Sequence, residues 1–142
     1  MKLTARSFGW LAAGVALMAG PALAHHSFAM FDRDKQLVLN GVVRQLKWTN
    51  PHAWLELDVL NGKGDKDRWI LELNSPSNLQ RQGWKSDVLK PGDKVTVMLN
   101  PLRGGERGGL FLQAKFDDGR VVSDQYLTSS SNPADKLKPA EW

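Results

Sequence analysis

Short stretches in which apolar and polar residues alternate, with the period of two that marks a strand, recur along most of this chain. The clearest covers residues 53–59. Its apolar positions are Ala53, Leu55, Leu57 and Val59, and its other positions are Trp54, Glu56 and Asp58. Because a strand places successive side chains on opposite faces, we expect the first set in the core. The second set should lie outside, with Trp54 partly exposed and both carboxylates solvated.

Five strands follow from this pattern, each bounded by turn-forming residues. They are expected at residues 37–48, 53–59, 68–74, 94–100 and 110–116. The first strand should bend or bulge at Gly41, because a glycine inside a strand has no side chain to pack. The expected connections are turns at 49–51, 90–93 and 117–119, a hairpin loop at 61–65, and a flexible Gly- and Arg-rich loop at 103–109.

One short helix is expected between the third and fourth strands. Ser75 suits the N-cap, Pro76 the first helical position, and Gly83 a left-handed residue after the last turn. Three strands, a helix and two further strands is the order of the oligonucleotide/oligosaccharide-binding (OB) fold. The expected fold class is therefore all-β with one short helix, a small five-stranded OB-like Greek-key barrel whose end the helix fills.

An unbroken apolar run from Phe8 to Gly20 precedes all of these strands and follows the basic residues Lys2 and Arg6. It ends in Ala22-Leu23-Ala24, which fits the A-x-A cleavage signal of a secretory signal peptide. We therefore expect an exported protein, periplasmic or secreted. The expected organisation is a cleavable signal peptide at 1–24, an N-terminal arm at 25–36, the barrel at 37–127 and a disordered tail rich in Ser, Pro and Lys at 128–142.

Composition narrows the range of functions. Two of the 19 Lys and Arg residues fall in the leader, so the mature chain carries 17 against 15 Asp and Glu, which is too balanced to indicate nucleic-acid binding. No second apolar run is long enough to span a membrane after cleavage. The chain has no Cys, which excludes disulfides, thiolate metal sites and cysteine nucleophiles. It also lacks the G-x-S-x-G, H-E-x-x-H and P-loop motifs, so we do not expect an enzyme.

Several motifs resemble one family of exported bacterial proteins, the domain of unknown function 6152 family. They lie at 25–29 (HHSFA), 39–43 (LNGVV), 48–54 (WTNPHAW), 72–76 (ELNSP), 81–84 (RQGW) and 89–97 (LKPGDKVTV). The resemblance covers about residues 25–122 and implies an exported, compact, mostly β domain. It implies no activity. Residues 101–109 depart from the family's usual connection in being longer and richer in Arg and Gly.

The chain contains three histidines, and two of them follow the cleavage site directly. Cleavage after Ala24 would give His25 a free α-amino group, with His26 next and His52 in the first predicted turn. The amine and ring of a terminal histidine, together with one further imidazole, form a planar nitrogen set that suits Cu(II). Because these donors must be deprotonated, and their reference pKa values are roughly 7.7–8.0 and about 6.5, mild acid should weaken binding.

We therefore expect a copper(II) site held by His25, His26 and His52 if the arm folds back onto the first turn. Asp32, Asp34 and Glu56 could supply axial or outer oxygens. The other interpretation is that the two leading histidines form a solvated terminus and that His52 is a turn residue bonded to a backbone carbonyl.

Aromatic and basic residues give a second hypothesis. Trp48 and Trp54, with Arg44 and Lys47 nearby, could stack and bind a ligand on the barrel surface. The alternative is that the tryptophans serve the core, with Trp69 and Trp84 closing its ends. The sequence thus favours a copper-binding protein for sequestration or delivery. The alternative function is a metal-free OB-like module for a small anionic or sugar-like ligand or a protein partner.

Overall fold

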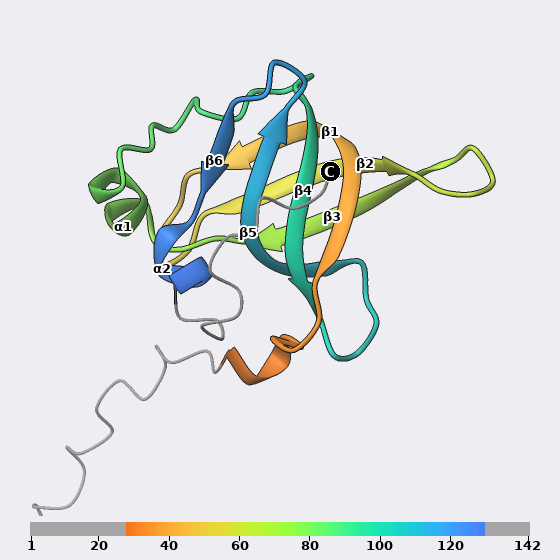
Figure 1. The fold of residues 1–142 in the computed structure, drawn as a ribbon, viewed down its shortest axis with the longest axis horizontal. Coiled ribbons are helices and arrows are strands. Elements are labelled where there is room, and N and C mark those ends of the chain that lie inside the picture. Colours follow the sequence, from red (N-terminus) through yellow and green to blue (C-terminus); the bar gives the residue numbers. More distant parts are fainter. Residues whose placement is uncertain (1–27, 130–142) are drawn as a thin grey trace, which may run out of the picture.

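The computed structural model describes residues 28–129, and the predicted signal peptide, His25, His26 and residues 130–142 lie outside the described part. Figure 1 shows a barrel with short helices at its margins. The elements are η1 (Phe28–Met30), β1 (Leu37–Lys47), β2 (Trp54–Leu60), β3 (Lys66–Glu72), α1 (Pro76–Arg81), β4 (Lys94–Pro101), β5 (Gly108–Phe116), β6 (Val121–Ser123) and α2 (Gln125–Ser129).

The first five strands close into a barrel, as predicted. The hydrogen-bonded order is β3-β2-β1-β4-β5, and a parallel pairing between β3 and β5 closes the ring. β1 makes this possible by pairing with β4 through Leu37–Val42 and with β2 through Gly41–Lys47. A sixth strand, β6, was not predicted. It extends the sheet beside β5 and follows the predicted 117–119 turn, in which Gly119 has a φ of 85°.

The alternation at 53–59 correctly identified the core face of β2. Ala53, Leu55 and Leu57 are all 0% exposed. They join a cluster of buried residues from every barrel strand, in which Trp84 packs edge-on against Phe111 with ring centroids 5.7 Å apart. Trp69 packs against the same cluster. The interpretation that Trp69 and Trp84 serve the core is therefore confirmed.

The predicted bulge in β1 was placed at the wrong residue. The register of β1 against β2 shifts between Val43 and Gln45, whereas Gly41 is regularly paired with both Val59 and Val95. Gly41 instead permits close approach, because a Cβ built there would lie 3.0 Å from the carbonyl oxygen of Asp58. Its role is to let β2 come close to β1 at this point.

The predicted flexible loop at 103–109 is shorter than expected, because Gly108 and Gly109 are buried residues of β5. Both lie where strands approach closely. A Cβ at Gly108 would lie 3.1 Å from the carbonyl oxygen of Ile70, and one at Gly109 would collide with the carbonyl oxygen of Asn100. Glycine here reflects crowding between strands, which a sequence pattern alone cannot separate from loop flexibility.

The predicted helix is α1, and its caps are as expected. The Ser75 side chain accepts from the amide of Asn78, Pro76 stands at the start, and Gly83 has a φ of 86°. Leu79 is 0% exposed and belongs to the barrel core, so the helix does fill the barrel end. No helix in the described range has the length and hydropathy to cross a membrane.

Both ends of the described chain cover the outer face of β5. Phe31, from the predicted arm, and Leu127, from α2, form a second buried cluster with Leu110 and Leu112 of β5; we name these four residues the arm seat. Phe31 also forms a bridge with Leu102, and the amide of Asp32 donates to the carbonyl of Pro101 at 2.8 Å. α2 was missed, and it begins before the predicted tail at 128.

Candidate metal-binding site at His52

His52 lies in the connection between β1 and β2, close to the end of β3. The hydroxyl of Thr49 donates to the His52 carbonyl at 3.2 Å, and the Asn50–Pro51 peptide bond is cis. The neighbouring Ala53 exchanges backbone hydrogen bonds with the segment after β3, donating to Asn74 and accepting from Leu73. These backbone hydrogen bonds attach the predicted turn to the end of β3, next to the His52 ring.

The ring of His52 is held through one nitrogen. Nδ1 lies 3.0 Å from the carbonyl oxygen of Leu73 and 3.2 Å from Oε1 of Glu72. A carbonyl oxygen can only accept, so this contact places the proton on Nδ1. In the neutral ring the lone pair is then on Nε2. The His52 side chain is 26% exposed.

Glu72 is a residue of this site that the sequence analysis missed. Its side chain is 8% exposed, and the residue pairs directly with Trp54 across β2 and β3. The sequence did contain a signal that could have placed Glu72 near His52. The hairpin pairs symmetrically about its 61–65 loop, and that symmetry sets Glu72 opposite Trp54, two residues beyond His52. The predicted third strand, shifted by two residues to 68–74, obscured this register.

Two of the three carboxylates proposed as outer oxygens, Asp32 and Glu56, are engaged elsewhere. Asp32 pairs with Lys35 at 3.1 Å, and the hydrogen bond from Lys35 lowers its pKa. Glu56 is buried rather than solvated, contrary to expectation, and a hydrogen bond from Lys47 holds its pKa below the ordinary value. Asp34 is exposed. Within residues 28–129, no three His, Asp or Glu side chains gather closely enough to hold a metal ion.

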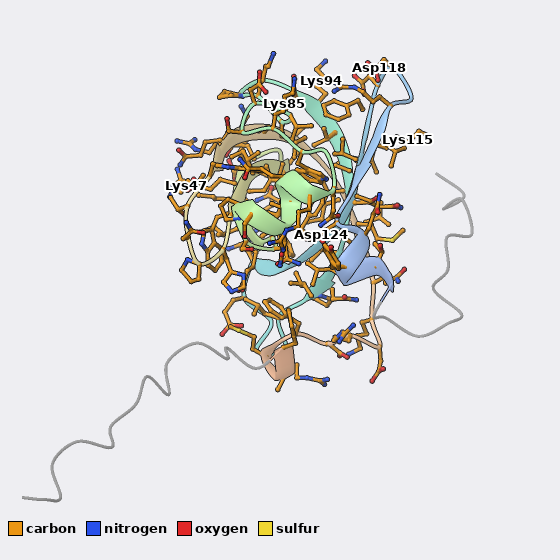
Figure 2. The ribbon with its side chains drawn as sticks, turned by 90° about the vertical axis from the view of Figure 1, so that its left-hand side faces the viewer. Lys47, Lys85, Lys94, Lys115, Asp118 and Asp124 are labelled. Atoms are coloured by element: carbon orange, nitrogen blue, oxygen red, sulfur yellow. The ribbon has the colours of Figure 1, made fainter. Side chains whose placement is uncertain are left out.

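The predicted ligand-binding residues form no open basic surface. Arg44 pairs with Asp58 at 3.5 Å and Lys47 with Glu56 at 2.6 Å, so carboxylates on the neighbouring strand offset both cations. Figure 2 shows Lys47 at the margin of the barrel. Trp48 is half-buried and packs against the core, which differs from the exposed stacking platform expected for it. Trp54 is half-buried, in agreement with its predicted partial exposure.

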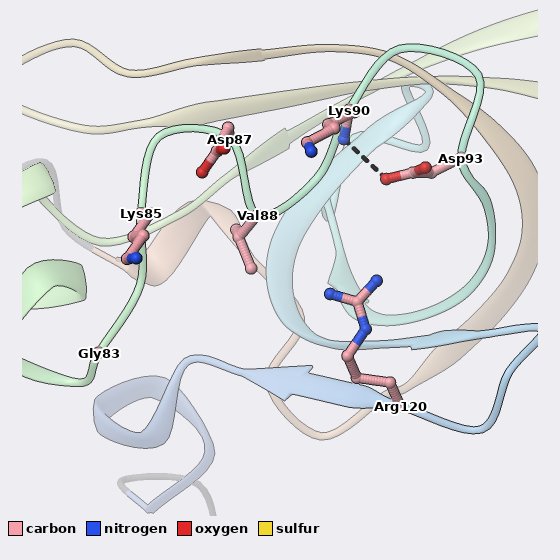
Figure 3. Close-up of a pocket in the computed structure, with 7 residues that line it drawn as sticks. All are labelled: Gly83, Lys85, Asp87, Val88, Lys90, Asp93 and Arg120. Carbon is pink, nitrogen blue, oxygen red and sulfur yellow. Dashed lines mark hydrogen bonds between the residues drawn. The ribbon is translucent and has the colours of Figure 1, made fainter.

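A hollow of about 380 Å³ lies elsewhere, between the segment after α1 and the β5–β6 turn (Figure 3). Three cationic side chains, Lys85, Lys90 and Arg120, line it together with Asp87 and Asp93. The Arg120 guanidinium stacks 3.8 Å from the Phe116 ring centroid. Since two carboxylates share the hollow, its charge is only slightly positive, and it contains none of the predicted ligand-binding residues.

Asp124 secures the backbone behind His52. It is 0% exposed, its Oδ2 accepts from the amide of Asn74 at 3.1 Å, and its Oδ1 accepts from the side chain of Gln82 at 3.2 Å. Figure 2 shows it between α1 and α2. Burial raises the pKa of this carboxyl above its ordinary value. The segment that orients His52 is thereby joined to both helices.

This topology and site define a small closed β-barrel protein of OB-like strand order with a fastened, partly exposed histidine beside a buried carboxylate. The chain belongs to the family of unknown function DUF6152, whose model matches residues 13–113. No curated protein and no solved structure matches the chain.

Proposed function

We propose that the mature protein is an exported copper-binding protein that sequesters or delivers Cu(II). After cleavage at Ala24, the α-amino group and ring of His25 would hold the ion together with the ring of His52, and His26 would assist. The described residues do not form a metal site by themselves, so the proposal requires donors from the start of the mature chain.

The observation that carries the proposal is the fastening of His52. Ligating histidines generally donate their second ring nitrogen to a carboxylate or a backbone carbonyl, which fixes the ring and makes the free nitrogen more basic. Nδ1 of His52 has both kinds of partner, Glu72 and the carbonyl of Leu73. The carbonyl contact alone would also suit a turn residue, so the buried carboxylate at the same nitrogen is what favours a ligand.

The anchoring of the arm supports the same proposal. Phe31 is 3% exposed in the arm seat, which also contains Leu110. Leu110 pairs with Glu72 across β5 and β3. The arm is thus tied to the outer face of the barrel on the strand next to the carboxylate that contacts His52. His25 stands three residues before Phe28, a span of at most about 10 Å when extended.

The chemistry favours Cu(II) and storage or transfer. Imidazole and amine nitrogens in a planar set bind Cu(II) more tightly than the other divalent first-row ions. All of these donors lose their protons before they coordinate, so acidification releases the metal. No substrate-binding platform accompanies the site in the described part of the chain, and for this reason we propose binding rather than catalysis.

The decisive experiment is a copper titration of mature protein that begins at His25, compared with a version carrying one extra Ser before it. The extension removes the terminal amine chelate and leaves the barrel unchanged, so we expect Cu(II) affinity to fall by at least about tenfold. Circular dichroism of both proteins checks the fold. Equal affinity in the two proteins would exclude coordination by the terminal amine.

A further inference from the structure

The hollow of about 380 Å³ between the segment after α1 and the β5–β6 turn has walls that are fixed to the barrel (Figure 3). At one end of the segment, Nε1 of Trp84 donates to the carbonyl of Ser123 in β6 at 3.2 Å. At the other end, the turn at 90–93 exchanges two backbone hydrogen bonds with Val43 of β1, each 2.8 Å long. The hollow is therefore preformed, and a ligand would lose little free energy in ordering its walls.

Five charged side chains line this hollow, and in the described part of the chain no ion pair joins any two of them. The cations are Lys85, Lys90 and Arg120, and the acids are Asp87 and Asp93. Within residues 28–129, neither Lys85 nor Lys90 has an ion-pair partner. Asp93 uses its Oδ2 to accept from the Lys90 amide at 2.8 Å. Both ammonium groups are thus available to an anion in the hollow.

Arg120 is the most constrained of the three cations. Its guanidinium stacks over the Phe116 ring, 3.8 Å from the centroid, and its Nε lies 3.8 Å from Oδ2 of Asp118. A stacked guanidinium presents its N–H groups along its edge, where they match the two oxygens of a carboxylate. In Figure 3, Arg120 extends into the hollow from the side opposite Lys85. Two anionic groups of one molecule can therefore contact Arg120 and the lysines at the same time.

We propose that this hollow binds a small dicarboxylic acid that carries a hydroxyl group. One carboxylate of the ligand pairs with Arg120 and the other with the lysines. A protein carboxylate accepts a hydrogen bond from a hydroxyl group but repels further negative charge. Asp87 and Asp93 therefore favour a hydroxy acid over a phosphate or a polyanion. This inference is independent of the copper proposal, because the hollow contains none of the predicted copper ligands.

The test is a titration of the mature protein with L-malate, without added copper, followed by NMR. Malate should shift the amide signals of residues 83–93 and 118–120 and the indole signal of Trp84, which lies between two residues of the hollow. Succinate lacks the hydroxyl group and should bind about 3–10-fold more weakly. Inorganic phosphate, which has no second anionic group to reach the opposite wall, should bind more weakly than malate.

Two substitutions test the cations. Lys85→Gln removes one charge, and Arg120→Lys keeps the charge but removes the planar pair of donors, so each should lower malate affinity at least about fivefold. Lys63→Gln is the matched control, since Lys63 is exposed in the β2–β3 hairpin loop, which points away from α1 in Figure 1. It removes the same charge as Lys85→Gln and should bind malate as wild type does. Thermal unfolding of the three variants checks the fold.

Equal malate affinity in wild type, Lys85→Gln and Arg120→Lys would place the ligand outside the hollow and overturn the proposal. The absence of any signal shift at about 10 mM malate, a concentration that detects even millimolar affinity, would do the same. Phosphate that binds as tightly as malate would show an unselective anion site and refute the ligand class. Weaker binding in both hollow variants, with Lys63→Gln unchanged, supports the proposal.

Discussion

Single buried polar residues hold the connections of this barrel in place. Asp124 accepts hydrogen bonds from the amide of Asn74 and from Gln82, and it has no exposed surface. Glu56 has the opposite electrostatic situation, because Lys47 at 2.6 Å stabilises its charged form. Both carboxylates are buried, yet one has a raised pKa and the other a lowered one. The difference is that Glu56 has a cation beside it, whereas hydrogen bonds alone compensate Asp124.

Asp124 should therefore give the protein a measurable pH dependence. Its pKa is higher in the folded protein than the ordinary value of 3.8, so the folded state binds this proton more tightly than the unfolded chain does. The resulting stabilisation is complete below pH 3.8 and is lost as the pH rises through the folded value. Asp124→Asn cannot titrate, and it also loses an acceptor, which costs about 1–3 kcal/mol.

Urea unfolding of wild type and Asp124→Asn over a pH series measures this effect. The stability advantage of wild type should grow as the pH falls from neutral towards 4. A difference that stays constant over that range would show that Asp124 titrates alike in the folded and unfolded protein.

At the scale of elements, β5 is the most constrained strand. Eight of its nine residues are buried, because the barrel core lies on one side and the arm seat on the other. β5 also has three strand neighbours, β3, β4 and β6. This crowding explains why its first two residues are glycines that look like a loop in the sequence.

Gly109→Ala should therefore destabilise the barrel. The added methyl group would collide with the Asn100 carbonyl oxygen and with Leu99, a cost of about 1–3 kcal/mol. Gly62→Ala is the matched control, because a Cβ there meets nothing within 4 Å, and its effect should stay within about 0.5 kcal/mol. Thermal and urea unfolding of both variants provide the comparison. Equal stability of the two variants would mean that β4 and β5 move apart to accept the methyl group at little cost in free energy.

At the scale of the whole molecule, the two ends of the described chain meet over β5. The arm contributes Phe31 and α2 contributes Leu127, and in Figure 1 η1 and α2 both lie near the same end of β5. Asp124, just before α2, holds the segment after β3 that contacts the His52 ring. Contacts thus link the arm to α2 and α2 to the segment beside His52. The anchoring of the arm would therefore contribute to the proposed copper site.

The arm can be released by one substitution. Phe31→Ala removes a ring that is 3% exposed and should lower the free energy of unfolding by about 3–5 kcal/mol. It should also weaken Cu(II) binding, because His25 would no longer extend from an anchored segment and its effective concentration at His52 would fall. Phe28→Ala alters a ring that is 42% exposed and should change stability by no more than about 0.5 kcal/mol.

Urea unfolding and copper titration of both variants measure these effects. The copper titration is made without urea, at a temperature at which circular dichroism shows that Phe31→Ala is still folded. Unchanged copper affinity in folded Phe31→Ala would show that the arm seat does not serve the site.

The sequence by itself determined the local features of this protein. Alternation assigned the core face of β2, and Ser75, Pro76 and Gly83 marked the ends of α1, because these features depend on neighbours a few residues away. Strand order and one helix were enough to predict the closed five-stranded barrel. For His52, the alternative interpretation of a ring bonded to a backbone carbonyl describes the contact with Leu73, and the role as a copper ligand stays a prediction.

Only the tertiary structure decided what depends on contacts between distant residues. Glu72 meets His52 through the exact register of β2 and β3, which a two-residue error in a strand boundary conceals. The arm seat, β6 and α2 exist because β5 needs cover on its outer face, and no local pattern in 121–129 signals that need. Periodicity reports which face of a strand is apolar, whereas the choice of partner for each face is made by packing across the whole barrel.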